Sequence, residues 1–311
     1  MRLFSALLFI MSISFFSCKQ EKKSEETSTT QHMHTPVVYV TNYPLYYFAN
    51  RIGGLAIELH FPASELSEPA MWTPETDTIA AMQQADFVFI NGATYEKWLM
   101  NTSLPDDIII NTGASFENQL LGNGEVFTHS HGDEKAHTHT GTAYTTWLNL
   151  EFANAQALAI KNALTEKFPN LETTFNSNFN ALSQELLELD QEFKSVGEQM
   201  QNPVIFSHPV YQYFQDAYGI KGKSLHWEPT DVINHDKMHE LKHLIENTPV
   251  TTLIWEAKPK AESIKTLQDK GIYSAVILPL SGKPSQGDFL SGIKQNLKTL
   301  KNLPLQVKPL L

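Results

Sequence analysis

Short apolar runs alternate with amphipathic segments along the first part of the chain. Four runs rich in Val, Ile and Phe, each bounded by Pro, Gly or Asn, lie in VVYVTNYP (37–44), IELHFP (57–62), DFVFING (86–92) and DIIINTG (107–113). Two segments between them, LYYFANRIGG (45–54) and PETDTIAAMQQA (74–85), have helical spacing. Continuous apolar runs that alternate with helices are typical of a buried parallel sheet. We therefore predict a first α/β lobe.

The same alternation returns near the C-terminus. Apolar runs lie in NPVIFSHP (202–209), KSLHWEP (223–229), TTLIWEA (251–257) and SAVILPL (274–280), and helical patterns lie in 210–219, 235–248, 261–271 and 287–300. Between the two halves, apolar residues recur every three or four positions at Phe175, Phe179, Leu182, Leu186, Leu189 and Phe193. This spacing predicts one amphipathic helix of about 25 to 30 residues, roughly 40 Å long. The expected fold is α/β, with two lobes, each a four-stranded parallel sheet with flanking helices, bridged by one long helix.

The N-terminal segment has the pattern of an export signal. One basic residue, Arg2, precedes about a dozen apolar residues and then Ser17 and Cys18, the only cysteine of the chain. This pattern is too short for a spanning helix, and a lone cysteine at its end suits lipidation in the manner of a bacterial lipobox. Simple secretion or an uncleaved anchor is the alternative. The polar segment that follows is expected to be a disordered tether.

These patterns together predict the domain organisation. We expect a signal peptide (1–17), a lipoprotein tether (18–35), an N-terminal lobe (36–150), linking helices (151–200) and a C-terminal lobe (201–311). The predicted location is the bacterial cell envelope, membrane-anchored through Cys18 and facing the periplasm or the exterior; inner and outer membrane are equally compatible.

Charge narrows the choice of partners. The chain of 311 residues carries 23 Lys plus Arg against 34 Asp plus Glu, a net charge of −11, and has no basic run. A nucleic-acid partner is therefore not expected. We expect a monomer.

The segment FTHSHGDEKAHTHTG (127–141) concentrates four of the twelve histidines, His129, His131, His137 and His139. It has no hydrophobic period, so a flexible loop is expected. Neutral imidazole is the commonest metal ligand in proteins, which favours a metal-attracting loop over a merely solvated one.

Polar residues at the ends of the second-lobe strands form a second candidate site. In the second lobe the apolar runs end in His208, in His226 with Glu228, and in Glu256. The first lobe contributes His60 and the loop that contains Glu65 and Glu68. Ligands of open parallel sheets bind at the carboxyl ends of strands. Imidazoles and carboxylates that converge there suit a divalent cation of the zinc class.

The ordered set of motifs resembles one family. VTNYPLYYFANRIGG, ADFVFINGATYEKWL, FNSNFNALSQELLELDQEF and SHPVYQYFQDAYGI are similar to segments of the metal-binding solute-binding lipoproteins of bacterial zinc and manganese ABC importers. The resemblance implies two lobes bridged by a rigid helix, an ABC permease partner, and a zinc-scavenging loop at 127–141.

The resemblance fails at most of the metal ligands. Where the family usually has His, His and an acid, this chain has Ala70, Thr145 and Leu278, and only His208 matches. One hypothesis is a rebuilt site of His208, Glu256 and His226 with an imidazole from His129 or His131, while His137 and His139 scavenge metal. The other is a degenerate member that binds another solute or acts as an adhesin.

Zinc is the expected cargo because of the histidine-rich loop; manganese is less expected. A metal-dependent hydrolase is the weaker alternative, and an enzyme is not expected. The segment HDKMH (235–239) has Asp where a zinc hydrolase has Glu. The histidines at 235, 239 and 243 share one helix face and could bind a metal at the surface with Asp236 or Glu240, although such a row is more often a solvated face. There is no nucleophile elbow or phosphate loop.

Overall fold

The computed structural model describes residues 34–66, 68–129, 137–246 and 250–304, with 123–129 and 137–140 described by backbone alone. From Thr35 onward the chain forms one compact unit. The predicted signal peptide, Cys18 and His131 lie outside the described residues. Within the described part, no helix has both the length and the apolarity needed to span a bilayer. The predicted domain boundaries stay predictions.

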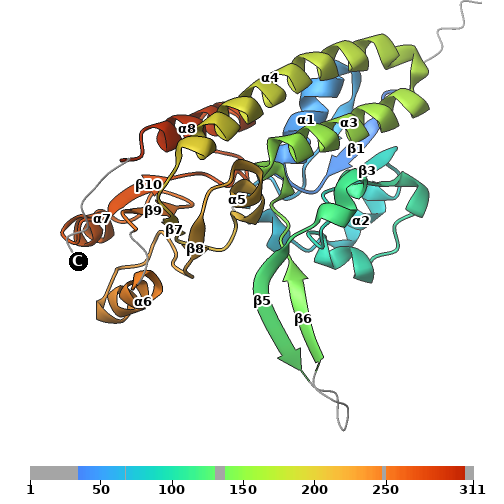
Figure 1. Cartoon of the computed structure of the whole chain (residues 1–311). Coiled ribbons are helices and arrows are strands. Elements are labelled where there is room, and N and C mark those ends of the chain that lie inside the picture. The colour runs from blue at the N-terminus through green and yellow to red at the C-terminus, as the bar shows by residue number, and fades with distance from the viewer. Residues whose placement is uncertain (1–33, 67, 130–136, 247–249, 305–311) are drawn as a thin grey trace, which may run out of the picture. The chain divides into compact units, whose positions relative to one another are not determined.

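The first lobe contains the predicted four-stranded parallel sheet. Its strands are β1 (Val37–Val40), β2 (Glu58–His60), β3 (Phe87–Ile90) and β4 (Ile109–Asn111), in the order β2-β1-β3-β4. Helices α1 (Tyr43–Gly53) and α2 (Thr76–Met82) lie near it (Figure 1). Alternate residues of β1, β3 and β4 enter different apolar clusters, so Val38 and Phe89 belong to one cluster and Tyr39 and Val88 to another. The sheet is therefore buried on both faces, as its continuous apolar runs predict.

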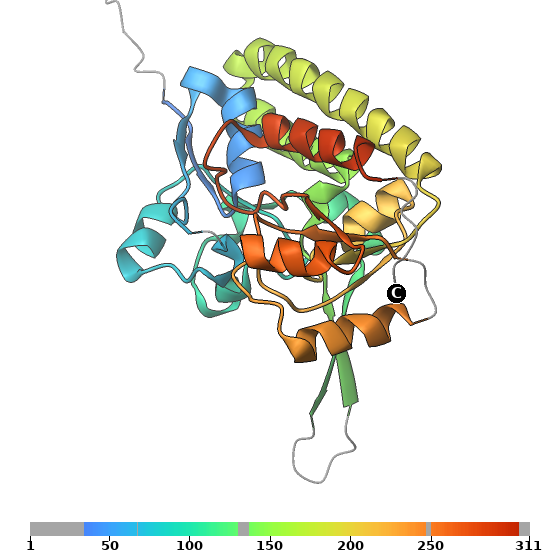
Figure 2. The same ribbon diagram turned by 90° about the vertical axis from the view of Figure 1, so that its left-hand side faces the viewer.

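The second lobe repeats this topology. Its strands are β7 (Val204–Phe206), β8 (Gly222–Ser224), β9 (Thr252–Trp255) and β10 (Tyr273–Val276), in the order β10-β9-β7-β8. Its helices are α5 (Gln212–Tyr218), α6 (His235–Ile245), α7 (Ala261–Gln268) and α8 (Phe289–Lys301). Helix α8 lies beside α4, whereas α6 and α7 pack on the other side of the sheet (Figure 2). In both lobes the first strand thus lies between the second and the third.

The predicted long helix is α4 (Glu172–Gln199), 28 residues that run beside α3 (Leu150–Lys167) (Figure 1). Five of the six predicted apolar positions are buried and Phe179 is partly buried. They join the cluster that also contains Phe89 of the first sheet and Phe206 of the second. The helix therefore contributes one apolar face to a core shared by both lobes.

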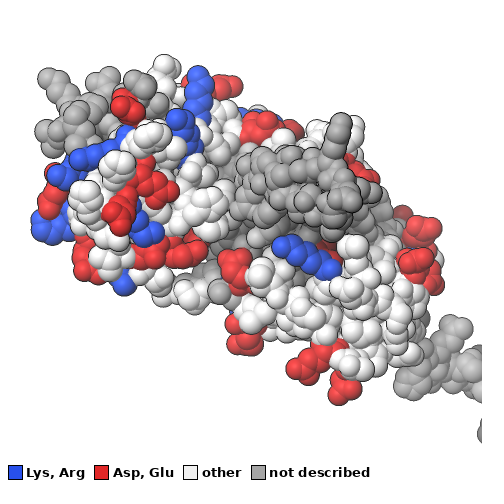
Figure 3. Space-filling view, turned by 90° about the horizontal axis from the view of Figure 1, so that it is seen from below, with Lys and Arg blue, Asp and Glu red and all other residues white. Residues whose placement is uncertain are grey.

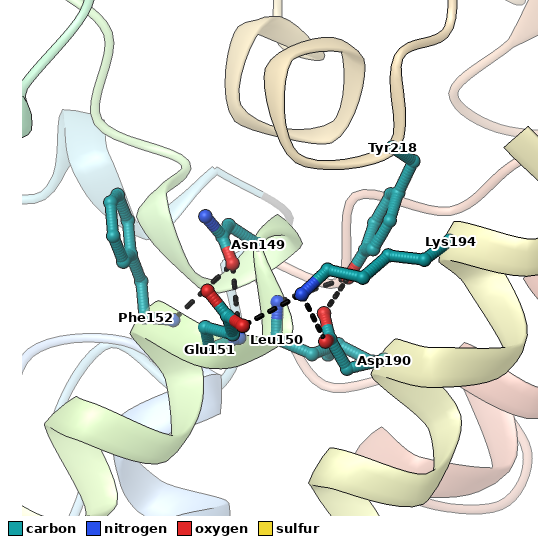
Figure 4. A network of polar contacts seen from close by, with 7 residues as sticks. All are labelled: Asn149, Leu150, Glu151, Phe152, Asp190, Lys194 and Tyr218. Atoms are coloured by element: carbon teal, nitrogen blue, oxygen red, sulfur yellow. Dashed lines mark hydrogen bonds and ion pairs between the residues drawn. The ribbon is translucent and has the colours of Figure 1, made fainter. Parts of the chain in front are cut away.

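A polar network fastens α4 to α3 and α5 (Figure 4). Lys194 Nζ lies 2.8 Å from Asp190 Oδ2 and 2.6 Å from Glu151 Oε1, and Asp190 is fully buried. The Tyr218 hydroxyl of α5 donates to Asp190 Oδ1 at 3.3 Å and accepts from the Leu150 amide at 3.1 Å. Removing one member of a buried charge pair leaves the other unpaired, so this network resists separation of the three helices.

Close backbone packing accompanies this network. A Cβ atom on Gly197 of α4 would lie 1.9 Å from the carbonyl oxygen of Tyr218. Only glycine therefore allows α5 to approach the long helix at this point.

The expectation of a loop at 127–141 was wrong for part of that segment. Strands β5 (Gly122–His129) and β6 (His137–Thr142) form an antiparallel hairpin, with His129 opposite His137 and Phe127 opposite His139. Antiparallel ladders need no apolar face to satisfy their backbone hydrogen bonds, which explains why the hydrophobic pattern did not predict it. The hairpin extends away from both parallel sheets (Figure 1).

Candidate metal centre

Three metal-binding side chains meet at the carboxyl edge of the second sheet. Glu256 directly follows β9, and His208 lies two residues beyond the end of β7. Glu228 lies four residues beyond the end of β8, where the amides of Leu225 and Trp227 donate to the carbonyls of Phe206 and Ser207. Strand β7 lies between β9 and β8, so the three strand ends bring these side chains to one place, at the point where the strand order reverses.

The donor atoms of these residues are close enough for one ion. One ligand atom of each of His208, Glu228 and Glu256 lies within 4.8 Å of the others. His208 Nδ1 lies 3.8 Å from Glu228 Oε1. One imidazole and two carboxylates form a donor set that accepts zinc and also harder divalent cations.

Electrostatics also favour a cation at this place. Burial, and to a lesser extent the neighbouring negative charges of Glu228 and Glu68, raise the pKa of Glu256 to about 7. A cation would reverse this effect, because it favours the ionised carboxylate. The cluster is therefore short of positive charge in the metal-free protein.

Glu68 extends the acidic cluster from the first lobe. It precedes a short 3-10 helix at Pro69–Met71, in the loop that follows β2. Its carboxyl is exposed, yet desolvation by surrounding atoms and then the charge of Glu228 raise its pKa. Glu68 and Glu228 therefore influence one another across the two lobes.

The described surface has an uneven charge distribution. Between residues 35 and 120 the only basic residues are Arg51 and Lys97. On the face seen from below, Lys and Arg gather mainly over the second lobe, while Asp and Glu occur over both (Figure 3). The first lobe thus presents a field that attracts cations.

The structure brings together two of the predicted ligands, His208 and Glu256, and adds Glu228. The His226 ring lies 5.7 Å from the His208 ring, centroid to centroid, but His226 is not a member of the close group. Leu225 and Trp227 are buried while His226 and Glu228 are exposed, which is the alternation of an extended chain. That alternation places Glu228 on the same side as His226. The sequence placed both residues at this strand end, but the predicted ligand set included only His226.

The three positions that lack the family ligands have structural roles here. Thr145 is buried, and its hydroxyl donates to the Val210 carbonyl at 2.6 Å, linking the two lobes beside His208. Leu278 packs against the shared core, and its backbone pairs with the Asn296 amide group at 2.8 Å. Ala70 is buried in the apolar cluster.

The other predicted histidines lie elsewhere or are not described at the side-chain level. His60 at the end of β2 stacks on Tyr39 and pairs with Glu58 at 2.9 Å. The backbones of His129, His137 and His139 belong to the hairpin, with His129 roughly 23 Å along β5 from Gly122 at about 3.3 Å per residue.

Known proteins resemble this chain over most of its length. A family model described as zinc-uptake complex component A periplasmic (ZnuA) matches residues 38–303. The zinc-binding lipoprotein AdcA of Streptococcus pneumoniae is 23% identical over 88% of this chain, which spans only about half of AdcA, 56% of its length. The metal ABC transporter substrate-binding lipoprotein ScbA of Streptococcus cristatus is 24% identical, with 96% of each chain covered.

A solved structure agrees with the fold. The Zn(II)-bound ZnuA-like domain of Streptococcus pneumoniae AdcA has a TM-score of 0.71 at 18% identity, covering 88% of this chain and all of that domain. These relatives are named as binding proteins rather than enzymes, in agreement with the expectation for this chain. Because the family model covers residues 38–303, the chain belongs to the ZnuA family of periplasmic zinc-uptake components.

Proposed function

We propose that this protein captures a divalent metal ion, zinc, between its lobes and delivers it to an ABC importer. The observation that carries the proposal is the group of His208, Glu228 and Glu256 at the strand-order reversal of the second lobe. The names of AdcA and ScbA, a zinc-binding lipoprotein and a metal ABC transporter substrate-binding lipoprotein, support the cargo and the partner.

In this proposal His208, Glu228 and Glu256 bind the ion from the second lobe, and Glu68 approaches it from the first. The electrostatic influence of Glu68 on Glu256, and of Glu228 on Glu68, supports Glu68 as the fourth ligand. Four protein ligands are the usual number for a zinc site that holds its metal firmly. His226 stands beside His208 and outside this set.

Manganese is a second candidate, because carboxylates outnumber imidazoles in the close group. Calorimetric competition between zinc and manganese for the purified protein identifies the ion that binds more tightly, and so distinguishes a zinc site from a manganese site. A protein that binds neither ion would support the alternative of a degenerate member that binds another solute.

Deleting residues 127–141 tests the role of the hairpin. We expect fewer zinc ions bound per protein, but a tightest dissociation constant within a few fold of wild type, because the close group lies on the second sheet. Calorimetric titration with zinc makes the measurement. Loss of the tight step would instead make His129 or His131 a ligand, as the sequence hypothesis of a rebuilt site suggested.

The proposed location is the bacterial cell envelope, with the chain anchored by a lipid on Cys18. Replacing Cys18 with alanine should move the protein from the membrane fraction to the soluble fraction, because the polar tether has no apolar segment that would retain it. Immunoblotting of separated fractions, with signal cleavage verified by mass spectrometry, makes the measurement. Retention of the cleaved variant in the membrane would exclude lipidation.

A further inference from the structure

Helix α6 carries a row of three histidines away from the cluster at the strand ends. His235, His239 and His243 are four residues apart and exposed, while Met238 and Leu241 on the opposite face are buried. His239 and His243 have no hydrogen bond or ion pair with any residue that the structure describes. Their imidazole nitrogens are therefore available to a ligand from solvent.

Three histidines in a row cannot all bind one ion. His235 and His243 are eight positions apart, roughly 12 Å along the axis at 1.5 Å per residue. Neighbours four positions apart have Cβ atoms about 6 Å from one another, and their side chains can converge on one ion. The choice is therefore between the pair His235 and His239 and the pair His239 and His243.

Both the sequence and the position on the helix favour His239 and His243 as the metal-binding pair. Residues 239–243 read HELKH, which matches the H-E-x-x-H pattern that the overlapping segment HDKMH fails. His243 lies in the last turn of α6, where the helix dipole favours a cation, whereas His235 is the first residue of the helix, where the dipole opposes one.

A hydrogen bond of Glu240 fixes the orientation of α6, and with it the direction in which His239 and His243 point. Glu240 Oε2 accepts a hydrogen bond of 2.8 Å from the indole nitrogen of the buried Trp227. This contact holds α6 against the segment that ends in Glu228, with His239 and His243 toward solvent. The same hydrogen bond occupies the Glu240 carboxylate, which is the group that would act as general base in a zinc hydrolase.

We propose that His239 and His243 form a second metal site, a weak surface site for a borderline divalent cation such as zinc, separate from the His208 group. Two protein ligands leave the remaining positions of the ion to water, so the site binds less tightly than a site with four protein ligands. The neighbouring Lys242 weakens it further by repulsion. The proposal does not depend on the function proposed for the cleft.

Zinc titration of the full chain tests this site. The four histidines of 127–141 are first replaced with glutamine, so that the hairpin does not contribute. In this background we expect one tight and one weaker zinc equivalent, measured by competition with two chelating dyes of different affinity. His239→Gln and His243→Gln should each weaken the second equivalent at least tenfold and leave the first unchanged.

Two matched variants on the same helix act as controls. Lys242→Gln and His235→Gln should both retain the weaker equivalent, because neither removes a proposed ligand. All four positions are exposed, so circular dichroism should show an unchanged fold. Retention of the weaker equivalent in His239→Gln would overturn the site, and its loss in His235→Gln would overturn the choice of pair. Zinc-dependent peptide hydrolysis that Glu240→Gln abolishes would overturn the role given to Glu240.

Discussion

Replacing His208 with alanine is expected to weaken the tightest zinc binding by at least about 100-fold, or about 3 kcal/mol. His208 is the only imidazole in the group with Glu228 and Glu256, and it lies between them in the strand order. Its removal leaves two carboxylates that repel each other without a neutral ligand between them. Competition with a chelating dye measures the change.

Two other histidines provide controls for this prediction. His226→Ala removes the ring that lies 5.7 Å from His208, and His239→Ala removes a ligand of the proposed surface site. Both should leave the tightest dissociation constant within a few fold of wild type. An equal loss from His226→Ala would place that imidazole among the ligands, as the sequence suggested, and an equal loss from His239→Ala would contradict a binding site at the strand ends.

Glu96 should control how the stability of the first lobe depends on pH. It is buried at the strand-order reversal of that lobe, where its carboxylate accepts from the Thr41 hydroxyl at 2.6 Å and from the amides of Asn91 and Gly92 at 2.7 and 3.2 Å. These bonds hold a turn in which Gly92, Ala93 and Thr94 all have positive φ. Burial nevertheless raises the pKa of Glu96 to about 7, against 4.5 for a free side chain.

The sign of the pH effect follows from this shift. The folded protein binds a proton at Glu96 more tightly than the unfolded chain does, so the contribution to stability is complete below pH 4.5 and is lost as pH rises through 7. A difference of about 2.5 pKa units corresponds to about 3 kcal/mol.

Glu96→Gln should therefore flatten the pH profile. At pH 5 we expect the variant to be about 1–3 kcal/mol less stable than wild type, because one oxygen becomes a donor opposite the Gly92 amide. By pH 8 the difference should shrink by about 3 kcal/mol, because the uncharged amide avoids burial of a charge. Urea denaturation between pH 4.5 and 8, with a chelator present, measures both values.

Glu188→Gln on the exposed face of α4 is the matched control and should leave the pH profile of wild type unchanged. Parallel profiles for Glu96→Gln and wild type would mean that Glu96 keeps its charge in the folded protein throughout this pH range.

The strand-order reversal of each sheet is occupied by different residues in the two lobes. In the first lobe the strand-order reversal is filled by Asn91, whose side-chain oxygen accepts from Gln156 at 3.0 Å, together with Thr41 and Glu96. In the second lobe the corresponding place carries His208 and Glu256, with Glu228 beside them. A buried hydrogen-bonded network stabilises the first lobe, whereas the second gathers an imidazole and two carboxylates that suit an ion.

The sequence by itself determined the two sheets, the long helix and two of the close ligands. Apolar runs such as 87–90 form buried strands because every residue of the run enters a core, and the apolar positions of α4 follow one helix face. These are local patterns, and they do not depend on what the segment packs against. Glu256 and His208 were predictable because they lie within two residues of the ends of such runs.

Only the tertiary structure decided which polar residues meet. Glu228 joins His208 because β7 lies between β8 and β9, and Glu68 influences Glu228 from the other lobe. The hydrogen bond from Tyr218 to Asp190 also depends on the fold, because Tyr218 lies on α5, whereas Lys194 lies four residues after Asp190 on the same helix. Contacts between strands and between lobes depend on the order in which distant segments pack, and a periodicity read along one segment contains no information on that order.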